Sequence, residues 1–226
     1  MCGRYALYTE PARLTAEFLT SNEFPDFARY NLTPGAFHPV VRQLPDGVRR
    51  VQPARWGLLP SWVKEPGKLA QPINAKSETV AEKPMFRHAF ARRRIIVPAS
   101  GWYEWKLEAG KKQPYFFSRA DGHPLAFAGL LEHWSGFEGE VETYAILTTA
   151  ANALAATVHD RMPVILEPAD YARWLDPALT QTGALTPLLA PAAAGVLQVW
   201  PVDRRVNRPT EDDAALVQAL RSATAP

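Results

Sequence analysis

The second residue of the chain, Cys2, is the position with the most distinctive chemistry. Removal of Met1 would leave an α-amine and a thiol on adjacent carbons, an arrangement that only an N-terminal cysteine has. The amine can add to an aldehyde to give a Schiff base, and the sulfur can then close a five-membered thiazolidine ring. Because an unperturbed α-amine has a pKa of about 7.7–8.0, part of it is free base near neutral pH. The alternative interpretation is a buried structural cysteine that follows the initiator.

Three further side chains are candidates for proton transfer or orientation. Glu104 lies between Tyr103 and Trp105 on an expected strand, where apolar surroundings would raise its pKa and suit it to proton transfer. Asn74 donates and accepts hydrogen bonds while neutral, so it can orient an amine without competing as a base. His159 can donate a proton near neutral pH. The local pattern alone equally allows a solvent-facing carboxylate, a turn asparagine and an exposed loop histidine.

Apolar runs separated by turn residues predict the elements that position these side chains. The pattern indicates an α+β fold: a single domain over residues 1–226, built on a curved, mostly antiparallel β-sheet or barrel with flanking helices. Helices are expected over 12–19, 151–158 and, after a cap at Thr210, 214–222. The expected strands are 37–44, 48–56, 94–98, 101–107, 113–119, 125–134, 141–149, 162–166 and 195–202. The first two form a hairpin, and the four from 94 to 134 form a meander.

Cysteine content and hydropathy exclude several classes of protein. The single cysteine rules out an internal disulfide, and without Cys/His clusters at ligand spacing we expect neither a metal site nor a cofactor. Arg4 and Glu10 interrupt the opening residues where a signal peptide needs an apolar run. The most apolar tract, 184–197, contains two prolines and is too short to cross a bilayer. We therefore expect a cytoplasmic monomer that does not bind membranes.

Charge is distributed unevenly along the chain. Residues 1–120 hold 19 Lys/Arg against 10 Asp/Glu, whereas residues 121–226 hold 6 against 13. This division favours a polyanion-binding surface built mainly from the first half, although scattered solvated charge is the alternative.

Eight short blocks occur in the order in which the SOS-response-associated peptidase (SRAP) family carries very similar ones. They are MCGRY, ARYNLTP, RWGLLPSW, INAKSE, RRRIIVPASGWYEW, FAGLLEHW, TYAILTTAAN and HDRMPVIL, and VNRPTEDDAALV resembles the family's usual ending. The resemblance implies autocatalytic removal of Met1, recognition of abasic sites in single-stranded DNA, and a durable DNA–protein cross-link through Cys2. It also implies that Asn74, Glu104 and His159 match the family's active-site residues, and that the protein associates with the nucleoid when bound to DNA.

Single-stranded DNA would require cations for phosphates and aromatic faces for unpaired bases. The candidates are Arg4, Lys76, Arg87 and Arg161 as phosphate contacts, with Trp56 and Trp62 for base stacking. Lys76 stands where many family members have arginine, which keeps the charge but loses bidentate geometry. Packed tryptophans are the alternative interpretation of the two aromatic positions, and the run 92–94 is most simply a solvated run before a buried strand.

Two other functions remain open on the sequence alone. The glutaminase domains of N-terminal-nucleophile amidotransferases also begin Met-Cys-Gly, but their glycine-rich strands and Asn-Gly element have no counterpart here. A non-catalytic single-stranded DNA-binding module would use the same basic and aromatic residues and would give only salt-labile complexes.

Overall fold

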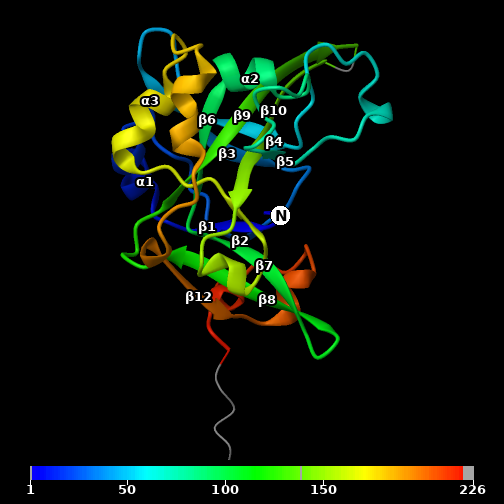
Figure 1. Ribbon diagram of the computed structural model, residues 1–226, viewed down its shortest axis with the longest axis vertical. Coiled ribbons are helices and arrows are strands. Elements are labelled where there is room, and N and C mark those ends of the chain that lie inside the picture. The colour runs from blue at the N-terminus through cyan, green and yellow to red at the C-terminus, as the bar shows by residue number, and fades with distance from the viewer. Residues whose placement is uncertain (1, 138, 221–226) are drawn as a thin grey trace, which may run out of the picture.

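Two β-sheets form the framework of the structure, a computed structural model that describes residues 2–137 and 139–220 (Figure 1). The smaller sheet has the strand order β12-β8-β7-β1-β2. Its strands are β1 (Tyr5–Leu7), β2 (Arg29–Leu32), β7 (Gly101–Glu108), β8 (Lys111–Arg119) and β12 (Leu197–Pro201). All the pairings within it are antiparallel.

The larger sheet closes on itself around the long strand β10 (Gly139–Ala150), which pairs with both β4 and β9. Its other strands are β3 (Phe37–Gln43), β4 (Arg49–Trp56), β5 (Asn74–Lys76), β6 (Arg94–Ala99), β9 (Leu125–Gly136) and β11 (Arg161–Pro163). The ring runs β10-β4-β3-β6-β9 and back to β10, with β5 and β11 also paired to β10. The prediction of an α+β fold on a mostly antiparallel barrel is confirmed, and only β4 and β5 run parallel to β10.

Short helices lie at the outside of the barrel (Figure 1). They are α1 (Pro11–Phe18), α2 (Arg87–Arg92) and α3 (Tyr171–Leu175). Helix α1 starts with a proline in its first turn, as the sequence predicts, and it packs on α3 through Phe18 and Tyr171, whose ring centroids are 5.6 Å apart. Trp174 fixes α3 to the barrel by donating its indole N–H to the Ile95 carbonyl at 2.8 Å. No helix in the described part of the chain is long and apolar enough to span a membrane.

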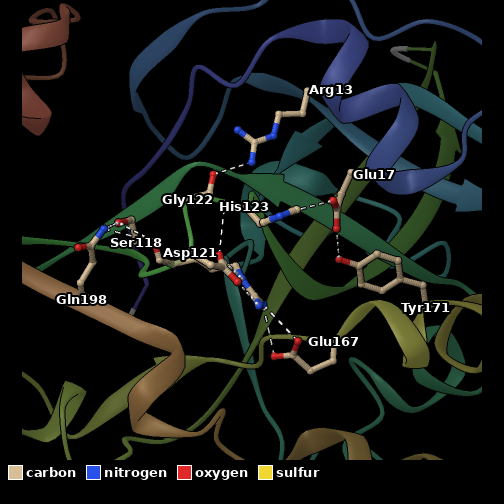
Figure 2. Close-up of polar contacts among 10 residues, drawn as sticks. Arg13, Glu17, Ser118, Asp121, Gly122, His123, Glu167, Tyr171 and Gln198 are labelled. Atoms are coloured by element: carbon tan, nitrogen blue, oxygen red, sulfur yellow. Dashed lines mark hydrogen bonds and ion pairs between the residues drawn. The ribbon is translucent and has the colours of Figure 1, made fainter.

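A polar cluster joins α1 to α3 and to the turn after β8 (Figure 2). Glu17 is its centre: one carboxylate oxygen lies 3.3 Å from His123 Nδ1, and the other accepts the Tyr171 hydroxyl at 3.4 Å. Arg13 donates from the same helix to the Gly122 carbonyl at 2.9 Å. These contacts hold the helical layer against the smaller sheet.

The predicted meander is correct for the β7–β8 hairpin and wrong for its other pairings, because the chain changes sheets at residues 100–101. Strands β6 and β9 belong to the barrel, whereas β7 and β8 belong to the smaller sheet. Gly101 permits the crossing, since a Cβ there would lie 2.3 Å from both the Phe116 ring and the Phe117 carbonyl oxygen. Ser100 anchors the crossing by donating its N–H to the Ala6 carbonyl at 2.7 Å.

Two predicted helices form only as 3₁₀ turns. The segment 151–158 is helical at Ala155–Thr157, and the closing segment at Ala214–Val217. The cap of the closing turn is Asp213, whose carboxylate accepts the Ala215 N–H at 3.0 Å, so the prediction of a cap at Thr210 is wrong. The predicted end of that helix, 221–222, lies outside the described residues.

Candidate active site

Strand β7 places Cys2 beside Glu104. Tyr5 of β1 pairs with Trp102, and the Tyr103 N–H continues this antiparallel register by donating to the Arg4 carbonyl at 3.0 Å. Extending the register toward the N-terminus brings Cys2 alongside the stretch of β7 that carries Glu104. The cysteine is a free thiol with no exposed surface.

Burial is the main influence on the Cys2 thiol. It raises the pKa of the thiol far above the ordinary value, the negative charge of Glu104 raises it further, and a hydrogen bond from the Arg4 backbone opposes the shift. The sulfur is therefore a protonated thiol at neutral pH, which makes it a poor first nucleophile.

Glu104 is 3% exposed on β7. Burial raises the pKa of its carboxyl to about 7, and the charge of Asp160 acts in the same direction. A carboxyl that titrates near neutral pH can both donate and accept a proton under ordinary conditions. The sequence-based expectation of a raised pKa agrees with this environment.

His159 lines the same pocket as Glu104, a cavity of about 440 Å³. Its Nδ1 lies 3.0 Å from the backbone nitrogen of Arg161. Burial lowers the pKa of the imidazole, while the Asp160 carboxylate, 2.9 Å from Nδ1, opposes this shift. At neutral pH the ring is therefore mainly neutral, with an N–H to donate.

Asn74 begins β5 and pairs with Ile146 of β10. Its Nδ2 donates to the Ile73 carbonyl at 3.0 Å, and its buried Oδ1 has no hydrogen-bond partner among the described residues. Asn74 is not among the residues that line the pocket of Glu104 and His159. The structure thus places Cys2 beside Glu104, and His159 in the same pocket as Glu104, whereas neither Cys2 nor Asn74 is among the residues that line this pocket.

The predicted phosphate contacts differ in how far their side chains are already engaged. Lys76 and Arg87 are exposed. Arg4 is partly buried, and its Nη1 donates to Asn31 Oδ1 at 2.7 Å and to the Val206 carbonyl at 2.8 Å. These bonds give Arg4 a structural role between β1, β2 and the C-terminal segment.

Arg161 forms a bidentate ion pair with Glu78, in which Nη2 lies 2.9 Å from Oε2. Its Nη2 also donates to the Thr148 carbonyl at 2.6 Å. A phosphate would have to displace Glu78 to take its place.

The two predicted stacking tryptophans lie in opposite environments. Trp62 is 60% exposed on the loop after β4. Trp56 is 1% exposed, and its indole N–H is bonded to the Ile73 carbonyl at 2.9 Å. The prediction that Trp56 stacks on an unpaired base is therefore wrong, since both of its faces are packed in the barrel.

A buried tyrosine pair lies behind Cys2. The hydroxyls of Tyr5 and Tyr144 are 3.0 Å apart, and the Cys2 sulfur influences the pKa of both, which places it close to them. Trp56 stacks on Tyr144 with ring planes 7° apart. Trp56 thus contributes to the rigid wall of the site rather than to its surface.

Three residues at the pocket were missed by the sequence analysis: Trp105, Lys112 and Asn207. Trp105 donates its indole N–H to Asn207 Oδ1 at 2.7 Å, which joins β7 to the C-terminal segment. Both lie in motifs that the sequence analysis quoted, GWYEW and VNRPTEDDAALV, but neither side chain has a distinctive chemistry by itself. In the described part of the chain, no group of three or more His, Cys, Asp or Glu side chains could hold a metal ion.

A family model, curated relatives and a solved structure each match this chain over most of its length. The family model for SOS response associated peptidase (SRAP) matches residues 1–209. "Abasic site processing protein YoqW" of Bacillus subtilis is 35% identical, covering 97% of this chain and 100% of the relative. "Abasic site processing protein YedK" of Escherichia coli is 31% identical with the same coverage.

A crystal structure of a Bacteroides thetaiotaomicron protein superimposes with a TM-score of 0.87 at 25% identity, covering 97% of this chain and 100% of that one. These findings decide against the amidotransferase interpretation. The chain belongs to the SOS response associated peptidase (SRAP) family.

Proposed function

We propose that the protein processes abasic sites in single-stranded DNA by forming a covalent thiazolidine cross-link through Cys2. The observation that carries the proposal is the placement of Cys2 beside Glu104, a residue that lines a pocket together with His159. The names of the relatives, abasic site processing proteins from bacteria and vertebrates, support the substrate.

The reaction begins with loss of Met1, which frees the α-amine of Cys2. An abasic deoxyribose is mostly a closed ring, so a proton must reach the ring oxygen before C1′ is presented as an aldehyde. His159, whose neutral ring carries one N–H, and Glu104, with a pKa of about 7, are suited to this transfer.

The amine then attacks C1′ and water leaves, which gives a Schiff base. The Cys2 thiol adds across the C=N bond, with its proton passing to nitrogen, and closes the thiazolidine ring. The buried, protonated state of the thiol supports this order, because the amine is the only strong nucleophile of Cys2 at neutral pH. Asn74, with an unengaged buried oxygen, is proposed to orient the amine.

The strand would be held by exposed cations and by Trp62. Lys76 and Arg87 are exposed, and Trp62 offers a free face to an unpaired base. Lys112 at the rim of the pocket is a further candidate for a phosphate adjoining the lesion.

The proposal is tested by incubating the protein with a single-stranded oligonucleotide that carries one abasic site, followed by a denaturing gel. We expect a heat-stable band of slower mobility with the abasic strand and none with the undamaged strand. Intact-mass measurement of the same sample should show that Met1 is absent. Binding to both strands without a covalent product would instead indicate a non-catalytic DNA-binding module.

A further inference from the structure

The basic run Arg92-Arg93-Arg94 does not contribute to the proposed active site. It spans the end of α2 and the start of β6, and all three residues line one cavity of about 560 Å³. That volume is typical of small-molecule sites. The cavity shares no lining residue with the pocket of Glu104 and His159.

The base of this cavity contains a buried cation. Arg94 is 4% exposed, and the hydrogen bonds from its guanidinium all go to neutral backbone carbonyls. The acceptors are Phe90, Ala91, Trp174, Asp176 and Leu179. A guanidinium in this setting carries its full charge, and no carboxylate of the described chain is hydrogen-bonded to it.

The carboxylates near the cavity are already engaged by other cations. Glu132 pairs with Arg93 at 3.1 Å, and Glu142 pairs with Arg42 at 3.1 Å. Arg92 is exposed and forms no ion pair within the described residues. Among the lining residues, four arginines face a single carboxylate, that of Glu142. With Arg93 and Arg42 paired to Glu132 and Glu142, the cavity keeps an excess of positive charge from Arg92 and Arg94, which favours an anionic ligand.

The rest of the lining is mixed, with polar Gln43 beside several apolar residues. The apolar residues include Ile95, Leu131, Leu175 and Pro177, and the imidazoles of His88 and His133 also line the cavity. A ligand that matches both parts must join an anionic group to a flat, apolar body. All five N–H groups of Arg94 are bonded to carbonyls, so it contributes charge, and the donors for a ligand are on Arg92 and on the remaining N–H groups of Arg93 and Arg42. Phosphate suits such guanidiniums, because each can donate parallel hydrogen bonds to its oxygens.

We infer that this cavity is a second site that binds a phosphorylated nucleotide, with the phosphate on the arginines and the base against the apolar residues. The nucleotide can be free or part of a DNA strand, and the recognition chemistry is the same in both cases. This inference does not rest on the proposed function, because it requires neither Cys2 nor an abasic aldehyde.

The test is a titration of the full chain with dAMP, followed by NMR of the histidine imidazole signals. His88 and His133 report on the cavity, and His159 reports on the other pocket. The His88 and His133 signals should shift with dAMP, shift more weakly with inorganic phosphate and stay unchanged with deoxyadenosine. Arg92→Glu should weaken dAMP binding about tenfold, which corresponds to about 1.4 kcal/mol. Arg204→Ala, the loss of an exposed arginine that lines neither cavity, should leave it unchanged.

A second titration distinguishes a free nucleotide from a nucleotide within a DNA strand as the natural ligand. If the natural ligand is part of a strand, an undamaged ten-residue oligothymidylate should shift the same signals at a lower concentration than dAMP. If it is a free nucleotide, dAMP should be the tighter ligand. Shifts confined to His159, or binding that Arg92→Glu leaves unchanged, would overturn the inference, and the cross-linking assay would be unaffected by that result. Urea unfolding of Arg92→Glu checks that the variant is folded.

Discussion

At the scale of single residues, three groups at or beside one pocket have different protonation states at neutral pH, with Cys2 and Glu104 buried and His159 partly exposed. The Cys2 thiol is protonated, the Glu104 carboxyl titrates at about 7, and the His159 ring is mainly neutral. Burial is the first cause in every case, and its direction depends on the group: it disfavours the thiolate, the carboxylate and the imidazolium alike. Burial thus keeps proton donors available at neutral pH and leaves the sulfur unreactive until the imine forms.

The raised pKa of Glu104 predicts a pH-dependent stability. The folded protein binds the Glu104 proton more tightly than the unfolded chain, so this group stabilises the fold fully below about pH 4.5 and loses that contribution as the pH rises to about 7. The loss is about 3 kcal/mol over this range. Urea unfolding between pH 4.5 and 7.5 should therefore show a steeper fall in the free energy of unfolding for the native protein than for Glu104→Gln. If the free energy of unfolding falls equally with pH in the two proteins, the raised pKa of Glu104 is contradicted.

The proton-transfer roles predict a separation of chemistry from binding. Glu104→Gln and His159→Ala should each slow cross-linking to an abasic strand about 100-fold, a typical value for loss of a general acid or base. Affinity for undamaged single strands should stay nearly the same, because neither residue is assigned to a phosphate. Cross-linking rates from quenched time courses and affinities from fluorescence anisotropy provide the two measurements. Equal losses in both would point to a binding role or to misfolding.

At the scale of elements, the two predicted phosphate contacts that flank Cys2 and Asn74 in the sequence differ in how far their side chains are already hydrogen-bonded. Lys76 ends the short strand β5 with an exposed side chain, whereas Arg4 precedes β1 and is hydrogen-bonded to Asn31 and Val206. Removal of the positive charge is therefore expected to have different effects at Lys76 and at Arg4.

Lys76→Ala should reduce the salt dependence of single-strand binding by about one charge. Arg4→Ala should instead lower the free energy of unfolding by about 1–3 kcal/mol, because it leaves buried acceptors without their donor. Affinities measured over a range of salt concentrations, together with urea unfolding, distinguish the two effects. Lys83→Ala, the loss of an exposed lysine outside the candidate site, is the control. A salt slope that is unchanged in Lys76→Ala would remove Lys76 from the DNA-binding surface.

The elements also show what the sequence could predict. Strand alternation and turn residues located β3, β4 and β7–β10, because those signals are local. The change of sheet at Gly101 was not predictable, since it depends on the close approach of Phe116 from another strand. Likewise, motif order pointed to Glu104 and His159, whereas the burial of Trp56 and the pairing of Arg161 with Glu78 depend on contacts between distant segments.

At the scale of the whole molecule, the barrel and the smaller sheet meet beside Cys2. Strand β1 carries the N-terminal segment against β7 in the smaller sheet, while Tyr5 reaches Tyr144 of the barrel. The basic first half of the chain supplies β3 to β7 and the exposed Lys76 and Arg87. Single-domain organisation, a monomeric state and association with the nucleoid remain predictions.

The central claim is that the amine and the sulfur of Cys2 act in succession, and one comparison separates them. Cys2→Ala keeps the amine after loss of Met1, so borohydride should trap its Schiff base with an abasic strand. Without reductant it should give no cross-link that survives heating, because no sulfur can close the ring. A protein with an uncleavable residue ahead of Cys2 has the sulfur without the amine and should give neither product. Heat-stable cross-linking by Cys2→Ala at the native level, or normal cross-linking by the blocked protein, would contradict the account.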